Sequence, residues 1–214
     1  ECKKRKIFVV YVPGYGDNTV AEFTFGLLLS LTRKIYQSID QIKETGSFSL
    51  EGLRGVDLKG RTIGVVGTGR IGKEVARIAK GFDMKIVGYD PYPDKKFAKK
   101  VGLEYLGLEE LLKNSDIISL HCPYTKDTHH LLSSKNIRLI KRGAYLINTA
   151  RGPIVESEAL VLALEEGILR GAAMDVLEEE GETKDELTIL AKGHPREEEL
   201  KTMLRNHVLM KMPN

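Results

Sequence analysis

The sequence has few cysteines and no long apolar run. Its two cysteines, Cys2 and Cys122, lie far apart and show neither Cys-x-x-Cys nor metal-ligand spacing. This pattern argues against a disulfide framework and a cysteine-based zinc site, so we expect no metal and a reduced, cytoplasmic setting. A membrane-spanning helix needs roughly 18 or more consecutive apolar residues. The chain contains no such run, so we expect no membrane partner.

A strong charge of one sign is also lacking. The 33 Lys and Arg residues nearly balance the 30 Asp and Glu residues, which gives a formal net charge of +3. Basic residues cluster only in the Lys-Lys-Arg-Lys run at 3–6, and a solvated turn is the simpler interpretation of that run. We therefore expect no nucleic-acid partner. The chain opens on Glu1 without a signal-peptide pattern, which suggests a fragment of a longer protein.

What the sequence does contain is a regular alternation of strand and helix patterns. Short apolar runs without in–out alternation predict buried parallel strands covered by helices on both faces, in a doubly wound α/β sheet of six or seven strands. Strands are predicted over residues 7–11, 62–66, 85–89, 116–120, 144–148 and 171–174. Helices are predicted over residues 19–43, 71–82, 94–100, 108–113, 134–140 and 156–166, with a charged, exposed helix within 178–205.

The first predicted helix begins just after a glycine-rich turn. Asn18 or Thr19 would cap it, and Glu22 stands three residues after Thr19, as in a capping box. Apolar residues at three-and-four spacing predict one continuous buried face, made of Val20, Phe23, Leu27, Leu28, Leu31 and Ile35. A loop over 46–60 follows, with scattered apolar anchors at Phe48, Leu50, Leu53 and Leu58.

A glycine pattern lies between the strand 62–66 and the helix 71–82. Gly67, Gly69 and Gly72 form G-x-G-x-x-G. The first glycine permits a tight turn, the second lets a pyrophosphate approach the backbone, and the third lets the helix pack closely on the strand. The free N–H groups and positive dipole end of the helix would face the phosphates. Three glycines can also form an ordinary turn, but the strand before and the helix after favour a dinucleotide site.

Asp90 ends the next predicted strand, 18 residues after Gly72. An acidic residue at about this distance bonds the adenosine ribose hydroxyls in dinucleotide-binding folds. Its carboxylate would repel the 2′-phosphate of NADP, so the cofactor is predicted to be NAD. The alternative is that Asp90 merely caps a turn with Pro91.

Several further segments, in the same order along the chain, resemble one family, the D-isomer-specific 2-hydroxyacid dehydrogenases. The resemblance covers essentially the whole chain. Its segments are Val12-Pro13-Gly14-Tyr15 with Val20-Ala21-Glu22, the glycine pattern with Gly88-Tyr89-Asp90-Pro91, Leu120-His121-Cys122-Pro123-Tyr124-Thr125 with Thr128-His129-His130-Leu131, Leu146-Ile147-Asn148-Thr149-Ala150-Arg151-Gly152, and Ala173-Met174-Asp175-Val176-Leu177-Glu178-Glu179-Glu180.

The resemblance implies a role for individual residues. It places a first group against the pyrophosphate and the adenosine ribose, namely Arg70, Ile71 and Asp90. It places a second group along the cofactor or near its nicotinamide ring, namely Cys122, Pro123, Thr128, Thr149, Ala150 and Asp175. It makes Arg151 the substrate-binding arginine and Glu180 the acid that partners a catalytic histidine.

The chemistry of such a reaction suits these residue types. A guanidinium such as that of Arg151 can fork onto an α-carboxylate and draw charge from the adjacent carbonyl oxygen. A carboxylate such as that of Glu180 raises the pKa of a neighbouring histidine and orients its ring. The alternatives are a surface arginine in a loop before Pro153, and a solvated glutamate run in which Glu179 takes the place of Glu180.

The family's catalytic histidine stands in a Thr-Pro-His segment, and none of the five histidines here has that context. We therefore expect it beyond Asn214, with the final strand and helix. By this interpretation residues 1–18 are an interdomain segment and residues 19–214 an NAD-binding domain, while the substrate domain comes from sequence outside the chain. Such a fragment should bind cofactor and turn over little.

The predicted reaction is hydride transfer between NAD(H) and a 2-oxo acid or D-2-hydroxy acid. Tyr124 and the charged stretch after Glu180 resemble D-lactate dehydrogenases, which favours pyruvate and D-lactate. The helix at 20–35 resembles one that relatives use for dimerisation, so a homodimer is expected, although a buried core helix is the alternative. A different class also remains open, a non-catalytic NAD(H)-sensing corepressor of the same fold. A third alternative is a dinucleotide module of unrelated chemistry.

Overall fold

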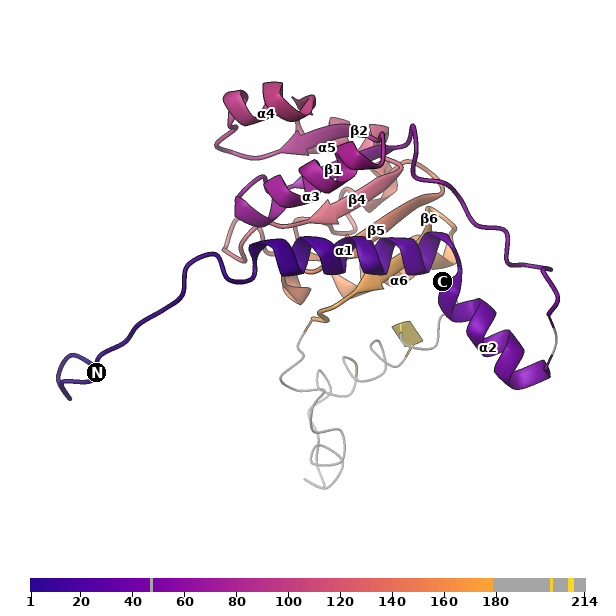
Figure 1. The fold of residues 1–214 in the computed structure, drawn as a ribbon, viewed down its shortest axis with the longest axis horizontal. Coiled ribbons are helices and arrows are strands. Elements are labelled where there is room, and N and C mark those ends of the chain that lie inside the picture. Colours follow the sequence, from indigo (N-terminus) through magenta and orange to yellow (C-terminus); the bar gives the residue numbers. More distant parts are fainter. Residues whose placement is uncertain (47, 179–200, 202–207, 210–214) are drawn as a thin grey trace.

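A computed structural model describes residues 1–46, 48–178, 201 and 208–209 of the chain. Within them, six parallel strands form one sheet in the order β3-β2-β1-β4-β5-β6 (Figure 1). The strands are β1 (Thr62–Val66), β2 (Lys85–Tyr89), β3 (Leu103–Tyr105), β4 (Ile117–Leu120), β5 (Ala144–Asn148) and β6 (Leu169–Met174). The chain order reverses between β1 and β4, and in open α/β sheets ligands bind at such a reversal, outside the carboxyl ends of the strands.

Helices cover both faces of this sheet. They are α1 (Asp17–Thr32), α2 (Ile35–Thr45), α3 (Arg70–Gly81), α4 (Lys95–Val101), α5 (Leu108–Asn114) and α6 (Ser157–Glu165), with short 3-10 turns at Ile137–Leu139 and Gly152–Ile154. One hydrophobic core holds residues of α1, α3 and α4, and a second holds residues of α5 and α6. In β4, Ile117 enters the first core and Ile118 the second. A strand that is apolar on both faces shows no alternation, as the sequence pattern indicated.

The predicted doubly wound sheet is therefore confirmed, and most predicted elements lie where they were expected. The strands β1, β2 and β5 have the predicted bounds. The interval 134–140 contains only one short 3-10 turn instead of a longer helix. The charged helix predicted within 178–205 falls almost wholly outside the described residues.

One predicted strand was wrong, and one strand was missed. Residues 7–11 form no strand, and their side chains are exposed, with Phe8 96% exposed. The segment extends away from the body of the domain (Figure 1), so a β-prone sequence has no neighbouring strand to pair with. Conversely, the short strand β3 was missed, because three residues are too few to show a periodicity.

The single helix predicted over residues 19–43 was also wrong. The chain breaks into α1 and α2 at Lys34, which adopts a left-handed conformation with φ of 55°. The loop that returns to the domain contacts the end of α1 at this break, where Val56 donates its backbone N–H to the carbonyl of Thr32. A Cβ at Gly55 would lie 2.6 Å from that same oxygen, so the returning loop needs glycine there.

The buried face of α1 is also rotated from the predicted one. The helix starts at Asp17 and no side chain caps it, in contrast to the predicted Asn18 or Thr19 cap. Phe23 and Ile35 are exposed, whereas Phe25 lies in the core and stacks on Phe82 with ring centroids 5.3 Å apart. The residues of α1 that are buried are Ala21, Thr24, Phe25, Leu28 and Thr32.

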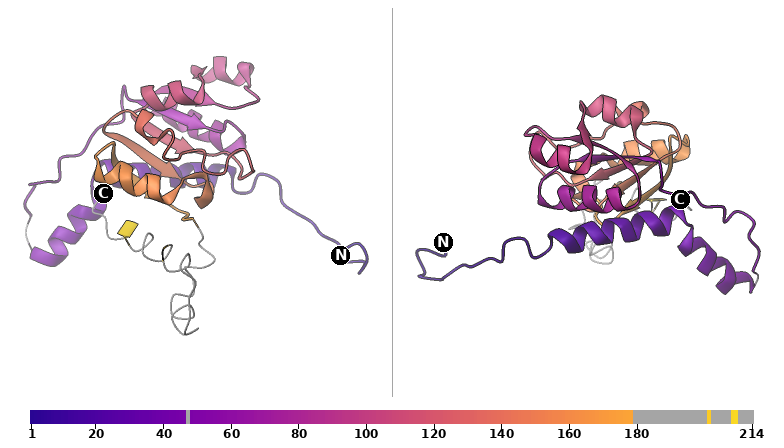
Figure 2. Two further views of the ribbon diagram at one scale, coloured as in Figure 1. Left: turned by 180° about the vertical axis from the view of Figure 1, so that it is seen from behind. Right: turned by 45° about the horizontal axis from the view of Figure 1, so that its top comes forward.

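Helix α2 buries none of its residues and projects from the domain (Figure 2). Ile35, Ile39 and Ile42 recur at helical spacing and are 41–44% exposed. In the loop that follows, Phe48 and Leu50 are exposed, so of the four predicted anchors only Leu58 is buried. Within the described part of the chain, no helix is long and apolar enough to cross a membrane.

Candidate functional site

The glycine turn after β1 is closed by close backbone approaches. Gly67 has φ of +91°, and a Cβ there would lie 2.6 Å from the backbone nitrogen of Cys122. A Cβ at Gly72 would lie 2.0 Å from the carbonyl oxygen of Gly67. Gly69, in contrast, has no heavy atom within 4 Å of its missing Cβ. The turn is thus tight at two glycines and open at the third, where a pyrophosphate would have to approach.

The first residue of α3, Arg70, lies beside this open position. No side chain caps the start of the helix, so its leading N–H groups and positive dipole end remain available to an anion. The Arg70 guanidinium is exposed and pairs with Asp17 of α1, with Nε 3.4 Å from Oδ2. Ile71 follows, half-buried. The helix start therefore suits the predicted phosphate contact.

Asp90 lies at the carboxyl end of β2, against the glycine turn. Its Oδ2 accepts hydrogen bonds from the backbone N–H of Thr68 at 2.7 Å and from the Thr68 hydroxyl at 3.0 Å. Its Oδ1 accepts from the N–H of Tyr92 at 2.8 Å. Asp90 thus closes a turn, as the alternative interpretation held, but it also joins the glycine turn itself.

The segment after β4 lies along the other side of the glycine turn. Thr128 donates its hydroxyl to the carbonyl of Pro123 at 2.7 Å, and the N–H of Thr125 donates to Thr128 Oγ1, also at 2.7 Å. Burial raises the pKa of the Cys122 thiol to about 11, so the thiol stays protonated at neutral pH. Cys122, Pro123 and Thr128 therefore border the site without a reactive thiolate.

His121 precedes this segment. Its Nε2 lies 2.7 Å from Ser119 Oγ in β4. Desolvation lowers the pKa of His121 to about 4, so its ring is neutral at neutral pH. A neutral ring bonded to a buried serine of the sheet indicates a structural role for this residue.

The turn after β5 carries three of the predicted residues, and Asn148 shapes it. Asn148 Oδ1 accepts from the N–H of Ala150 at 3.0 Å, and its Nδ2 donates to the carbonyl of Arg151 at 3.0 Å. Thr149 is buried, with its hydroxyl 3.0 Å from that of Thr24 in α1. Arg151 is exposed, and its Nη1 donates to the carbonyl of Ala150. The guanidinium is therefore presented from a fixed turn.

Residues after β6 lie beside this turn. The N–H of Asp175 donates to the carbonyl of Asn148 at 3.0 Å, and the Asp175 side chain is exposed. A Cβ at Gly152 would lie 1.9 Å from the carbonyl oxygen of Leu177, so only glycine allows the two segments to approach this closely. Glu180 lies outside the described residues.

Glu178 anchors the end of this segment. Its Oε1 lies 2.5 Å from His130 Nε2, and its Oε2 accepts from the hydroxyl of Ser157 at 2.8 Å. Burial raises the pKa of the Glu178 carboxyl, but hydrogen bonds from His130 and Ser157 outweigh it and leave that pKa below its usual value. The first glutamate of the 178–180 run is therefore anchored and is not mere solvated surface.

The predicted residues that the structure describes thus gather at the carboxyl ends of β1, β2, β4, β5 and β6. Sequence reasoning missed Thr68, Tyr105 and Asn148, which position the others. Thr68 and Asn148 stand inside motifs that were recognised in the sequence. Their hydrogen-bonding side chains could have marked them there as positioning residues. Tyr105 belongs to the missed strand β3 and had no such signal.

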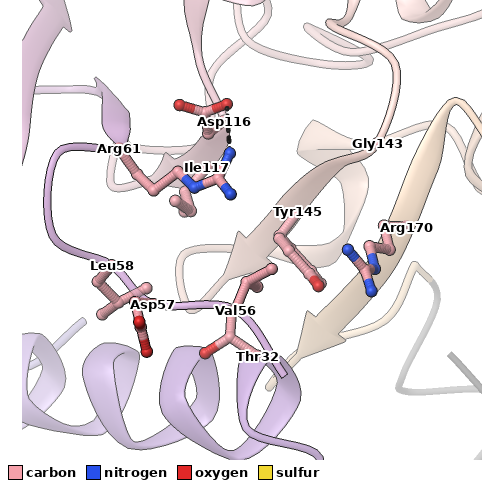
Figure 3. Close-up of a pocket in the computed structure, with 10 residues that line it drawn as sticks. All are labelled: Thr32, Val56, Asp57, Leu58, Arg61, Asp116, Ile117, Gly143, Tyr145 and Arg170. Carbon is pink, nitrogen blue, oxygen red and sulfur yellow. Dashed lines mark ion pairs between the residues drawn. The ribbon is translucent and has the colours of Figure 1, made fainter. Parts of the chain in front are cut away.

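A small cavity lies at the opposite edge of the sheet, by the amino ends of the strands (Figure 3). Asp116 there accepts from Lys141 Nζ at 2.8 Å and lies 3.7 Å from Arg61 Nη1. Burial raises the pKa of Asp116, but its bonds to Lys141 and to the Thr62 N–H outweigh this effect, so the pKa is lowered. The cavity contains none of the predicted site residues.

Known proteins match both the sequence and the fold. Residues 25–214 match the family described as "D-isomer specific 2-hydroxyacid dehydrogenase, NAD binding domain". The chain is 44% identical over 181 residues to a 2-hydroxyacid dehydrogenase homolog of Zymomonas mobilis, covering 84% of this chain and 54% of that protein. It is 46% identical over 187 residues to a glyoxylate reductase of Thermofilum pendens, with the same two coverages.

A solved structure matches nearly all of the chain. The D-lactate dehydrogenase of Aquifex aeolicus, complexed with NAD and lactic acid, is 38% identical with a TM-score of 0.83. The match covers 99% of this chain and 61% of that one. The chain thus spans about half the length of the curated relatives that it matches.

These matches confirm the resemblance and the predicted NAD cofactor. The open position at Gly69, the uncapped start of α3 and the carboxylate of Asp90 fit a dinucleotide: a backbone approach, an anion site and an acceptor for ribose hydroxyls. The chain belongs to the D-isomer-specific 2-hydroxyacid dehydrogenase family, and its matched region is that family's NAD-binding domain.

Proposed function

We propose that the protein to which this domain belongs interconverts a 2-oxo acid and a D-2-hydroxy acid. The observation that carries the proposal is the exposed guanidinium of Arg151, presented from the Asn148 turn at the same edge of the sheet as the glycine turn. When bound, NAD accepts or donates the hydride. The remaining tasks of the protein are to bind the acid, orient it and manage one proton.

Arg151 would bind the substrate carboxylate. A guanidinium offers donors in a fixed fork that matches a carboxylate, and the same group can polarise the adjacent carbonyl oxygen. Its backbone is held because Asn148 accepts the Ala150 N–H and donates to the Arg151 carbonyl. The side chain can therefore approach a substrate without rearranging the turn.

Glu180 would manage the proton through a histidine that follows Asn214 in the longer protein. Its carboxylate would raise the pKa of that histidine and fix the orientation of its ring. The anchored Glu178 lies two residues before it and fixes where the segment leaves the sheet. We likewise propose that residues 1–18 connect to a substrate domain and that residues 19–214 form the cofactor domain, which alone would turn over little.

Pyruvate and D-lactate are the proposed substrate pair. Tyr124, at 50% exposure beside the cofactor site, supports this choice, as do relatives named D-lactate dehydrogenase in Curvularia clavata and Aquifex aeolicus. Glyoxylate reductases also appear among the relatives, so glyoxylate is the competing substrate. The ratio of kcat/KM for pyruvate and glyoxylate in the full-length protein decides between them.

A second copy of the chain is the proposed partner, in a cytoplasmic homodimer. Helix α1 proved to be a core helix over much of its length, whereas the isoleucines of α2 at 35, 39 and 42 stay 41–44% exposed. Covering this face would bury apolar area and favour association. Light scattering of wild type and Ile39→Asp tests it: the variant should be monomeric if α2 forms the interface.

Arg151→Ala in the full-length protein tests the enzymatic proposal. Losing a charged, forked hydrogen bond should lower kcat/KM on the order of 100-fold or more, while NADH affinity stays unchanged. Arg170→Ala is the matched control, because this exposed arginine lies by the cavity at the opposite edge of the sheet. Unchanged turnover in Arg151→Ala would overturn the assignment, and absence of turnover in the wild type would favour an NAD(H)-sensing protein.

A further inference from the structure

Thr68 lies inside the glycine turn, and its side chain faces β2. The residue is 4% exposed. A Cβ at Gly88 would lie 3.2 Å from Thr68 Cγ2, so the absence of a side chain at Gly88 makes room for the threonine methyl group. With the methyl group seated over β2, Thr68 Oγ1 lies 3.0 Å from Asp90 Oδ2 and 2.8 Å from the Tyr105 hydroxyl.

The hydrogen bonds around Thr68 run in one direction. An ionised carboxylate only accepts, so the Thr68 hydroxyl proton goes to Asp90. The Tyr105 hydroxyl must then donate to Thr68 Oγ1. The oxygen of Tyr105 in turn accepts the backbone N–H of Asp94 at 3.1 Å. Each of the two hydroxyl groups, those of Thr68 and Tyr105, therefore both donates one hydrogen bond and accepts one.

The start of this series is itself held in place. Asp94 caps α4 by accepting the N–H of Phe97 at 3.0 Å, and it pairs with Lys73 of α3 at 2.6 Å. Lys73 follows the glycine turn by one residue. Through Lys73, the start of the series is thus tied to α3, the helix whose amino end would bind the pyrophosphate.

The donors on Asp90 leave part of its carboxylate open. Each carboxylate oxygen can accept about two hydrogen bonds. Oδ2 accepts two, both from Thr68, whereas Oδ1 accepts one, from Tyr92. One acceptor position on Oδ1 therefore has no donor within the described residues, and the carboxylate cannot rotate without losing its three bonds.

We propose that Thr68 and Tyr105 are positioning residues for cofactor discrimination. They hold the Asp90 carboxylate so that its open acceptor position receives a ribose hydroxyl of NADH, while its charge stays where a 2′-phosphate of NADPH would lie. Tyr105 acts through Thr68, and the absence of a side chain at Gly88 leaves room for the Thr68 methyl group. The proposal concerns the cofactor and does not depend on which acid the protein reduces.

Fluorescence titration of the 214-residue chain with NADH and NADPH tests the proposal. The quantity measured is the ratio of the two dissociation constants. Tyr105→Phe keeps the ring and removes the donor to Thr68, so the preference for NADH should fall about 3- to 10-fold. Thr68→Val removes the hydroxyl bond to Asp90, although the bond from the backbone N–H stays, and should lower the preference further, towards that of Asp90→Ala.

Two controls separate positioning from a loss of packing. Thr68→Ser restores the hydroxyl and should restore the preference. Tyr145→Phe removes a hydroxyl beside the cavity at the opposite edge of the sheet and should leave both affinities unchanged. Thermal unfolding of each variant checks that it folds. If Tyr105→Phe does not fold, the comparison of Thr68→Val with Thr68→Ser provides the test.

Three results would overturn the proposal. The first is a preference in Tyr105→Phe and Thr68→Val within twofold of the wild type. The second is an equal weakening of both cofactors in these variants, which is what a merely structural role produces. The third is a wild-type chain that binds neither cofactor or does not prefer NADH, because there is then no discrimination to position.

Discussion

The cofactor side and the substrate side of the candidate site are built differently. On the cofactor side, at the ends of β1 and β2, Asp90 accepts three hydrogen bonds and the glycine turn is fixed by close backbone approaches at Gly67 and Gly72. On the substrate side, at the ends of β5 and β6, the Arg151 and Asp175 side chains are exposed. Their backbones are held by Asn148, and among the described residues the Arg151 guanidinium bonds only to the neighbouring Ala150 carbonyl. The residues proposed to recognise the cofactor are thus held in place within the domain, whereas the proposed substrate-binding arginine, Arg151, is exposed to solvent.

Gly72→Ala should have the largest effect on stability, because it would disrupt the glycine turn on the cofactor side. The new methyl group would meet the Gly67 carbonyl at 2.0 Å, and overpacking of this kind lowers the free energy of unfolding by about 3 kcal/mol. Urea denaturation measures the loss. Gly69→Ala is the control: its methyl group meets nothing within 4 Å, so stability should change by less than about 0.5 kcal/mol.

The same pair of variants distinguishes folding from binding. Gly69→Ala should still weaken NADH binding, because the methyl group would occupy the position that a pyrophosphate approaches. If Gly69→Ala binds NADH as tightly as the wild type, the open position is not the pyrophosphate site, and the cofactor side is less well organised than the geometry indicates.

Glu178→Gln removes the charge of the anchored carboxylate on the substrate side and should have an intermediate effect on stability. The folded pKa of Glu178 lies below its unfolded value, so the carboxylate stabilises the fold above about pH 4.3 and that contribution is lost as the pH falls through the folded pKa. The variant should be less stable by about 1–2 kcal/mol at pH 7, and the difference should shrink below about pH 4.

Chemical denaturation between pH 7 and pH 3 measures that difference. Asp116→Asn is the matched control at the opposite edge of the sheet, because the pKa of Asp116 is also lowered. It should show the same pH trend without altering turnover in the full-length protein. A stability difference for Glu178→Gln that stays constant down to pH 3 would contradict a Glu178 pKa lowered by its hydrogen bonds to His130 and Ser157.

Asp17→Asn should have the smallest effect on stability, and it tests how Arg70 on the cofactor side is positioned. The Arg70 side chain of this pair is exposed, so loss of the pair should change stability by less than about 0.5 kcal/mol. The freed guanidinium could then turn to the pyrophosphate, and NADH affinity should rise by roughly twofold or less, an effect that salt removes. A marked fall in affinity would instead mean that Asp17 holds Arg70 in its binding position.

Much of the cofactor side could be predicted from the sequence, because its constraints are local. Gly67, Gly69 and Gly72 follow one strand and open one helix, and the structure gives each the space that its expected role requires. Tyr105 could not be found in this way, because it reaches Thr68 only through the pairing of β3 with β2. That pairing is a tertiary contact between segments that carry little pattern of their own.

The errors near the amino terminus have a related cause. Neither glycine nor proline marks the break at Lys34, so the helical spacing of apolar residues continues through it and predicts one helix. In the structure the helix ends there, and the later loop at Val56 bonds to the end of α1 at Thr32. The β-prone segment 7–11 lacks a neighbouring strand within the described residues. Local propensity describes what a segment favours, whereas a strand also needs a partner to pair with.

The three hydrogen bonds on Asp90 also bear on the entropy of cofactor binding. A side chain that is ordered only in a complex costs about 0.5–1.5 kcal/mol in lost rotamer freedom. Asp90 is already confined by Thr68 and Tyr92, so that loss has occurred during folding. Calorimetry should therefore find that loosening this carboxylate weakens NADH binding mainly through a less favourable entropy, and only in smaller part through enthalpy.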